Sequence, residues 1–388
     1  MSNFEQIKIL NDAYLAENYA RFPVAIDHGE GATLYDTEGK SYIDFGSGIS
    51  VNIFGANDVQ WKEAVISQLG KIAHVSNYYY SEPQSKLAEL LCEKTGARRV
   101  FFGNSGAEAN ECAFKAARKY SFQKYGEGRS KIVSLKGSFH GRTLFTITAT
   151  GQDEFHKYFG PFVPDVDWSE PNMSDIRRVA GNNTCAIVIE CVQGEGGVKA
   201  LDPEFVSALE RYCKENDILL ICDEVQCGNG RAGKLYAYEH YGISPDIVTT
   251  AKGLGGGLPI GACLLYKKAE HALQPGDHGS TFGGNPVCCA GAYNILSRLT
   301  DEFLLEVQGK SEYLRAKLKK VDGVKEVTGL GLMIGFKVDG NPKEIAKKCL
   351  EKGLLILTAH DVVRLLPPLN ITKTELDEGL NILREVLR

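Results

Sequence analysis

The stretches Cys185-Ala-Ile-Val-Ile-Glu190 and Ile218-Leu-Leu-Ile-Cys222, with a helix opening at Asp202-Pro203 between them, decide the fold of this chain. Both stretches are short, continuous apolar runs, which is typical of strands buried on both faces. Aspartate caps a helix and proline suits its first position, so the intervening segment is predicted to be helical. A strand, a helix and a strand in succession predict an α/β fold on a parallel sheet with helices on both faces.

The same alternation of strand and helix patterns runs from about residue 60 to residue 285. Further strands of the same apolar character are expected at 100–102, 131–135, 247–250 and 261–266. Before this region, a helical pattern from Ile7 to Leu15 leads into two short strands at 33–36 and 41–45. These first residues are expected to form an N-terminal arm.

The pattern changes after about residue 290. A helix over 290–319, strands between 326 and 338, a helix over 342–352, a further strand and a last helix are expected there. The last helix opens with Thr372-Lys-Thr-Glu375, a capping box. We therefore expect an N-terminal arm with part of a small domain (1–55), a large domain (56–285) and a C-terminal small domain of α+β type (286–388).

Composition argues against several classes of function. Charged residues make up 24% of the chain and the net charge is −5, which gives no electrostatic case for nucleic-acid binding. No apolar run approaches the roughly 18 residues that span a bilayer, and the polar start of the chain does not resemble a signal peptide. The 11 cysteines include no Cys-x-x-Cys pair, so they are interpreted as buried hydrophobes in a reducing compartment. We expect a cytoplasmic protein without a metal site.

Three chemically distinctive features follow the ends of expected strands, where open α/β sheets bind their ligands. Ser105-Gly106 begins a helix, whose first N–H groups suit a phosphate. Asp223 ends the strand at 218–222, where a partly desolvated carboxylate needs a cationic partner. Lys252 ends the run Asp246-Ile-Val-Thr-Thr-Ala-Lys252, and burial there would lower its pKa and make its amine a nucleophile.

Each feature taken alone has an ordinary structural alternative. Ser105 and Glu108 fit the capping box of an ordinary helix, and Asp223 fits a residue that caps the next turn. Lys252 fits a solvated surface lysine at the end of a strand. Together on one sheet edge, an anion site, a buried acid and a lysine are the fixtures that pyridoxal phosphate requires. The combination favours this cofactor.

Several longer motifs in the chain resemble the class III aminotransferases, pyridoxal-phosphate enzymes of fold type I. The motifs are 42–52, 104–111, 138–143, 193–197, 223–226, 251–253 and 278–286. The resemblance extends nearly end to end. It implies a mostly parallel seven-stranded sheet in the large domain, a smaller α+β domain built from both termini, and a homodimer with a shared active site.

The resemblance also implies a role for each residue that touches the cofactor. Lys252 would bond the cofactor aldehyde and then move the substrate proton, while Asp223 would pair with the protonated ring nitrogen. The remaining cofactor contacts would be Ser105, Gly106 and Ala107 at the phosphate, Phe139 and Val225 at the ring faces, Gln226 near the ring's 3-oxygen, Glu224 beside them, and Thr281 from the neighbouring subunit.

Five further residues are expected to bind the substrates. Arg142 would hold the substrate α-carboxylate, and Arg364 would hold the carboxylate of glutamate or 2-oxoglutarate. Glu195 would pair with Arg364 while an amine donor is bound, and Ser280 would reach the substrate from the partner chain. Ile49 stands where ornithine aminotransferases place a tyrosine, and an apolar residue there disfavours a free α-ammonium group.

The expected reaction is therefore transfer of the δ-amino group of N2-acetylornithine to 2-oxoglutarate, as in arginine biosynthesis. Succinylornithine, ornithine and 4-aminobutyrate remain alternative donors. An aminomutase or racemase of the same fold and a non-enzymatic binding protein are alternatives of other classes. The chain departs from the family pattern at Phe54–Trp61, near the expected substrate entrance and dimer contact, which bears on the acyl group accepted. It also carries Cys227 where threonine is common.

Overall fold

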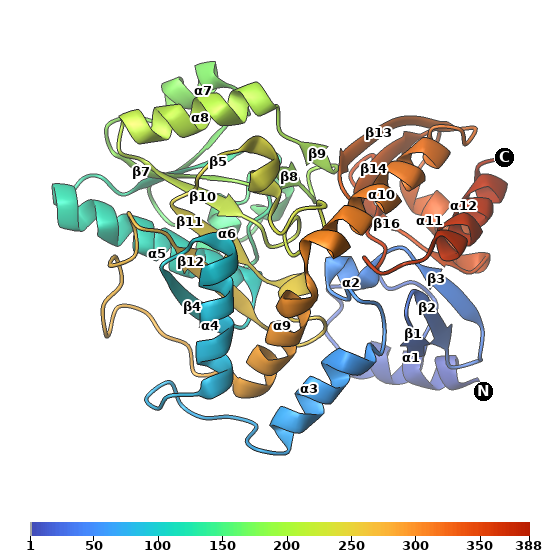
Figure 1. Cartoon of the computed structure of the whole chain (residues 1–388). Helices are drawn as coiled ribbons and strands as arrows, with labels where there is room; N and C mark the ends of the chain where they lie inside the picture. The colour runs from blue at the N-terminus through green and yellow to red at the C-terminus, as the bar shows by residue number, and fades with distance from the viewer. Residues whose placement is uncertain (1) are drawn as a thin grey trace.

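The computed structural model describes residues 2–388, and its centre is a seven-stranded sheet in the order β4-β12-β11-β10-β7-β5-β6 (Figure 1). The strands are β4 (Arg99–Gly103), β5 (Lys131–Leu135), β6 (Val166–Ser169), β7 (Thr184–Ile189), β10 (Leu219–Asp223), β11 (Ile247–Thr250) and β12 (Gly261–Leu265). Only β12 runs against its neighbours. The predicted, mostly parallel sheet is confirmed.

Helices cover both faces of this sheet, as the continuous apolar strands require. Leu219 and Ile221 of β10 pack in one core with α5 (Gly106–Tyr125). Leu220 and Cys222 of the same strand pack in the other core with α8 (Pro203–Glu215). The Asp202 side chain accepts from the Phe205 N–H and caps α8, as predicted. Around them lie α4 (Glu82–Thr95), α6 (Leu144–Ala149), α7 (Met173–Val179) and the short turns η1 (Asp153–Phe155), η2 (Ala237–Tyr241) and η3 (Lys252–Leu254).

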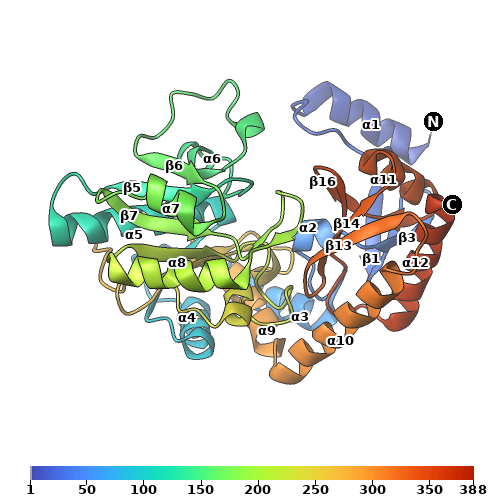
Figure 2. The same cartoon turned by 90° about the horizontal axis from the view of Figure 1, so that it is seen from above.

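Both chain termini contribute to a smaller unit beside the large sheet (Figures 1 and 2). One sheet joins the N-terminal strands β1 (Ile26–Glu30), β2 (Thr33–Asp36) and β3 (Ser41–Asp44) to β15 (Leu354–Leu355). A second sheet has the order β13-β14-β17-β16, from Val324–Leu330, Met333–Val338, Val362–Leu365 and Leu357–Ala359. The helices α11 (Pro342–Glu351) and α12 (Lys373–Leu387) complete it, and α12 begins at the predicted Thr372 capping box.

The single helix predicted over 290–319 is wrong. The structure has α9 (Pro286–Arg298) and α10 (Asp301–Leu318), and α9 packs against α3 (Val59–Leu69) and α4. The chain breaks between them because the Thr300 side chain accepts from the Phe303 N–H at 3.2 Å and starts a new helix. The edge strand β6 and the strand β1 were not predicted, since both are short and partly polar.

Two remaining features concern the N-terminal helix and the possibility of a membrane-spanning helix. The predicted N-terminal helix exists as α1 (Asn3–Tyr14), but none of its residues is buried in the single chain. No helix within residues 2–388 has both the length and the apolar character needed to cross a membrane. The elements not yet named are α2 (Ser47–Ser50), β8 (Val192–Gln193) and β9 (Lys199–Ala200).

Candidate active site

The carboxyl ends of β7, β10 and β11 meet at a cavity of about 390 Å³. Asp223 is the last residue of β10, and Lys252 follows β11 by two positions. The cavity is lined by Val51, 104–107, 139–141, Glu190, Asp223, Val225, Gln226, Ala251, Lys252 and 257–260. The structure therefore brings the three features predicted at strand ends to one edge of one sheet.

Lys252 starts the turn η3 in a left-handed backbone conformation, with φ +46°. Such a conformation is strained for a residue with a Cβ and is often found at functional sites. Burial lowers the pKa of the Lys252 amine; the charge of Glu195 opposes this shift, and the charge of Arg364 adds to it. The lowered pKa agrees with the expectation of a buried amine that acts as a nucleophile.

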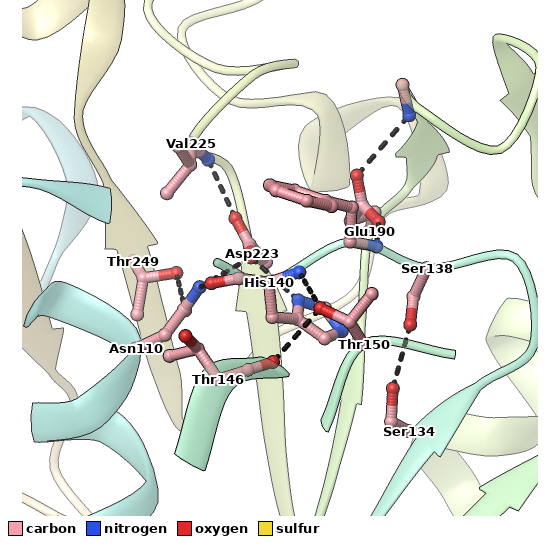
Figure 3. Close-up of polar contacts among 12 residues, drawn as sticks. Asn110, Ser134, Ser138, His140, Thr146, Thr150, Glu190, Asp223, Val225 and Thr249 are labelled. Atoms are coloured by element: carbon pink, nitrogen blue, oxygen red, sulfur yellow. Dashed lines mark hydrogen bonds and ion pairs between the residues drawn. The ribbon is translucent and has the colours of Figure 1, made fainter. Parts of the chain in front are cut away.

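Asp223 is held by three hydrogen bonds and is only 3% exposed (Figure 3). Its Oδ2 accepts from the Asn110 amide and from His140 Nδ1, each at 2.8 Å, and its Oδ1 accepts from the Val225 N–H at 3.0 Å. The Asn110 side-chain oxygen accepts in turn from the Thr249 hydroxyl at 2.7 Å. These contacts fix the carboxylate in one orientation at the cavity wall.

His140 and Asn110 were not among the predicted site residues. Both lie inside motifs that the sequence analysis quoted, at 138–143 and 104–111. Because Nδ1 faces a carboxylate, it is the protonated ring nitrogen that donates. Nε2 of the same ring is buried and has no partner among residues 2–388. The signal was present in the motifs, but which side chains converge on Asp223 depends on the sheet topology.

The loop after β4 brings the first N–H groups of α5 to the cavity. The Ser105 side chain accepts from the Glu108 N–H at 3.2 Å, as predicted. The reciprocal half of the predicted capping box is absent, because the Glu108 carboxylate accepts from the Asn104 N–H at 2.8 Å instead. A Cβ at Gly106 would lie 2.6 Å from Val225 Cγ1, so this close approach of the loop to Val225 needs glycine.

Arg364, on β17, forms a buried cluster with Glu195 and Gln226. Its Nη1 donates to Glu195 Oε1 at 2.6 Å and to Gln226 Oε1 at 3.1 Å, and the arginine is 3% exposed. Burial alone would raise the pKa of Glu195, but the charge and hydrogen bond of Arg364 outweigh it and hold that pKa below its ordinary value. Of the three, Gln226 lines the cavity, so the cluster reaches the cavity wall through its side chain.

Phe139 lines the cavity, and Arg142 lies three residues further along the same loop. The Arg142 guanidinium is exposed and lies over the Phe155 ring, 4.4 Å from its centroid, and 5.5 Å from that of Phe139. The arginine is therefore close to the cavity mouth and open to a ligand.

Besides Arg142, Glu195 and Arg364, four more predicted residues do not line this cavity. Ser280 Oγ accepts from the Asn104 amide at 3.1 Å, and Thr281 is exposed. The Glu224 carboxylate accepts from the backbone of η2, at Ala237 (2.9 Å) and Tyr238 (2.8 Å). Ile49 lines a separate apolar cavity of about 280 Å³ between the N-terminal arm and β15–β16.

The residues of the cavity fit pyridoxal phosphate. A buried carboxylate that lines the cavity suits a pyridinium nitrogen, and a helix N-terminus suits the phosphate. A lysine with a lowered pKa suits the aldehyde. The aromatic ring of Phe139 and the branched side chain of Val225 supply apolar walls for a flat ring.

Comparison with known proteins establishes the class. The aminotransferase class-III family model matches residues 14–387, and the chain belongs to this family. It is therefore a transaminase that depends on pyridoxal phosphate.

Particular relatives narrow the likeness further. The acetylornithine aminotransferase of Haemophilus ducreyi is 50% identical over 387 residues, which covers 99% of this chain and 98% of that protein. The same enzyme of Caldanaerobacter subterraneus is 48% identical, covering 96% and 97%. Among solved structures, the ornithine aminotransferase of Toxoplasma gondii superposes with a TM-score of 0.95 at 30% identity, covering 100% of this chain and 95% of that one. The acetylornithine aminotransferase of Elizabethkingia anophelis gives 0.89 at 30% identity, covering 100% and 99%.

Proposed function

We propose that this chain transfers the δ-amino group of N2-acetyl-L-ornithine to 2-oxoglutarate, giving N-acetyl-L-glutamate 5-semialdehyde and L-glutamate in arginine biosynthesis. The observation that carries the proposal is the Arg364–Glu195 pair, which contacts Gln226 in the wall of the Lys252 cavity. Such a pair is neutral toward a donor that has no carboxylate beside its reacting amine and carries its carboxylate far from it. It offers a guanidinium to a dicarboxylate once Glu195 moves aside.

In this mechanism pyridoxal phosphate supplies the carbonyl that takes the substrate amine and the ring that withdraws electrons from the substrate carbon. Lys252 holds the cofactor and then carries the proton that leaves the substrate carbon. Its lowered pKa suits both roles. Asp223 keeps a positive charge on the ring nitrogen, and Asn110 and His140 keep Asp223 oriented.

The remaining residues position the two molecules. Ser105, Gly106 and Ala107 would bind the phosphate through the first turn of α5. Phe139 and Val225 would pack on the ring, with Gln226 at its 3-oxygen. Glu224 would act indirectly, by holding the segment that follows it against η2.

Substrate binding divides between two arginines. Arg142, exposed at the mouth, would bind the α-carboxylate of the donor, and Arg364 would bind a carboxylate of 2-oxoglutarate. A guanidinium donates two parallel hydrogen bonds to a carboxylate, which fixes the orientation as well as the charge. Glu195 would remain paired with Arg364 when the acetylated donor binds.

The active unit we propose is a homodimer in the cytoplasm, in which Ser280 and Thr281 complete the partner's site. Apolar exposure supports an interface near these residues. Phe282 is 60% exposed and Tyr80 is fully exposed in the single chain. The proposed domains remain 1–55, 56–285 and 286–388. Sedimentation of the purified protein measures the dimer directly.

Succinylornithine, ornithine and 4-aminobutyrate are the competing donors. The high TM-score to an ornithine aminotransferase does not favour ornithine as the donor, because the fold is shared across the class. Sequence identity is more specific, and it reaches 50% with an acetylornithine aminotransferase. The predicted contact of Ile49 with the donor has no support from its position in a separate cavity. The choice of donor therefore rests on relatives and on the Arg364 cluster.

A panel of the four amines tests the proposal. Each donor is mixed with enzyme under single-turnover conditions, the cofactor absorbance is followed, and 2-oxoglutarate is then added to reverse the change. We expect kcat/KM for N2-acetylornithine to exceed that for ornithine by at least about tenfold, a typical gain from one well-matched group. Equal or faster turnover of ornithine overturns the assignment, and a half-reaction that 2-oxoglutarate does not reverse excludes 2-oxoglutarate as the amino acceptor.

A further inference from the structure

Glu190 is a buried acid at the cavity that the sequence analysis did not select. It follows the last residue of β7, lines the cavity and is 5% exposed. None of the ion pairs formed within residues 2–388 includes it. A carboxylate without a cationic partner is costly to bury, so hydrogen bonds must hold it.

Two backbone N–H groups supply those hydrogen bonds, and they belong to different loops. Glu190 Oε1 accepts from the Phe139 N–H at 2.7 Å, and Oε2 accepts from the Gly194 N–H at 3.3 Å (Figure 3). The first loop carries Phe139 and Arg142, and the second carries Glu195. One carboxylate therefore connects the two loops through separate oxygens.

The two loops also touch directly. A Cβ at Gly196 would lie 2.2 Å from the Gly137 carbonyl oxygen, so the backbones are in close contact there. The Gln193 amide donates to the Lys136 carbonyl at 2.9 Å. Because these contacts lie beside the Glu190 bonds, a shift of one loop is transmitted to the other.

Only an acceptor with two oxygens satisfies this geometry. A glutamine has the same length, but its NH₂ group would face one of the two N–H donors. Burial raises the pKa of Glu190 to about 7, while a charge on His140 would lower it and that of Asp223 raises it. Its backbone bonds favour the ionised form against this cost.

We propose that Glu190 is a positioning residue that fixes the distance across the cavity between the Phe139–Arg142 loop and the Glu195 loop. Through the first loop it fixes the positions of Phe139, which packs on the cofactor ring, and Arg142, which binds the α-carboxylate. Through the second loop it fixes the position of Glu195, which neutralises Arg364. The proposal rests on the proposed function for the roles of these residues. The coupling of the loops does not depend on which amine is the substrate.

Glu190→Gln in the holoenzyme tests the proposal by amide hydrogen exchange. We expect exchange in peptides covering 136–143 and 193–198 to rise together by about tenfold or more, as loss of a charged hydrogen bond implies. KM for both substrates is expected to rise about tenfold with kcat changed less than about threefold. Affinity of the apoenzyme for pyridoxal phosphate is expected to fall, because Phe139 is displaced.

Asp246→Asn is the matched control. Asp246 accepts a backbone N–H, from Leu220 at 3.0 Å, where β10 begins at the opposite edge of the same sheet. It is expected to change stability without changing exchange in either loop. If Glu190→Gln does not fold, Glu190→Asp replaces it, because the shorter carboxylate reaches only one loop.

Two results overturn the proposal. One is unchanged exchange in either loop, which means that Glu190 does not couple them. The other is a fall in kcat with KM and cofactor affinity unchanged, which assigns Glu190 a part in proton transfer. Failure of the acetylornithine assignment leaves the exchange data unaffected, so the two proposals fail separately.

Discussion

Replacing Glu195 by glutamine is the sharpest test of the Arg364 cluster. The substitution keeps the size of the side chain and removes one charge from a 2.6 Å contact with an arginine that is 3% exposed. Charge-assisted hydrogen bonds contribute roughly 1.5–3 kcal/mol and neutral ones roughly 0.5–1.5 kcal/mol, so the pair weakens by about 1 kcal/mol. The Glu195 side chain is 28% exposed, which keeps the effect near this value and below that of a fully buried pair.

The two substrates are expected to respond in opposite directions. 2-Oxoglutarate competes with Glu195 for Arg364, so its KM falls about five- to tenfold when the competitor weakens. The acetylated donor brings no anion to Arg364, and its KM rises by a similar factor because the guanidinium is less well neutralised. The ratio of the two KM values therefore changes by about 25- to 100-fold.

Single-turnover half-reactions measure this ratio, since each substrate is then studied without the other. Glu204→Gln provides a control with the same change of charge at an exposed position on α8. It is expected to leave both KM values unchanged. A shift of both KM values in the same direction, or none in either, would falsify the exchange of partners at Arg364.

Three further changes have defined outcomes. Lys252→Ala is expected to retain the fold and lose about 10²–10⁴-fold or more of the turnover, and borohydride treatment followed by mass spectrometry is expected to find no attached cofactor. Arg298→Ala removes a guanidinium stacked 3.7 Å from the Phe54 ring centroid and bonded twice to Asp58, so urea unfolding is expected to give a loss of about 1–3 kcal/mol. Burial raises the pKa of Glu224 from 4.5 to about 7, so its contribution to stability is full below pH 4.5 and is lost as pH rises through 7. In Glu224→Gln, the fall in stability between these pH values is expected to be about 3 kcal/mol smaller; an equal fall in both proteins contradicts the assignment.

The strand ends were predictable because the signals are local. An apolar run of five or six residues followed by Asp223 or Lys252 indicates both the strand and the edge on which the residue lies. The break at Thr300 was also local, but a strong helical pattern on both sides concealed it. Periodicity is insensitive to one capping residue inside a long apolar pattern.

The hydrogen-bond partners were not predictable in the same way. Asn110, His140 and Glu190 lie on three different elements, and only the strand order of the sheet brings them to Asp223 and to one another. The cavity that Ile49 lines was not predictable for the same reason, because a motif gives a residue's neighbours in sequence but not its neighbours in space. The sequence therefore indicated which segments carry the site, whereas the hydrogen-bond partners of their side chains depend on tertiary contacts.

The Arg364 cluster links substrate choice to the chemistry of Lys252. The charges of Glu195 and Arg364 shift the pKa of the Lys252 amine in opposite directions, so their effects oppose each other while the two are paired. When Glu195 moves aside, the arginine alone would lower that pKa further, until the carboxylate of 2-oxoglutarate takes the vacated place. In each productive complex Lys252 then faces one cation, Arg364, and one anion, which is either Glu195 or the carboxylate of 2-oxoglutarate. A dicarboxylate is accepted because it restores this balance, and a donor with no carboxylate beside its reacting amine is accepted because it does not disturb it.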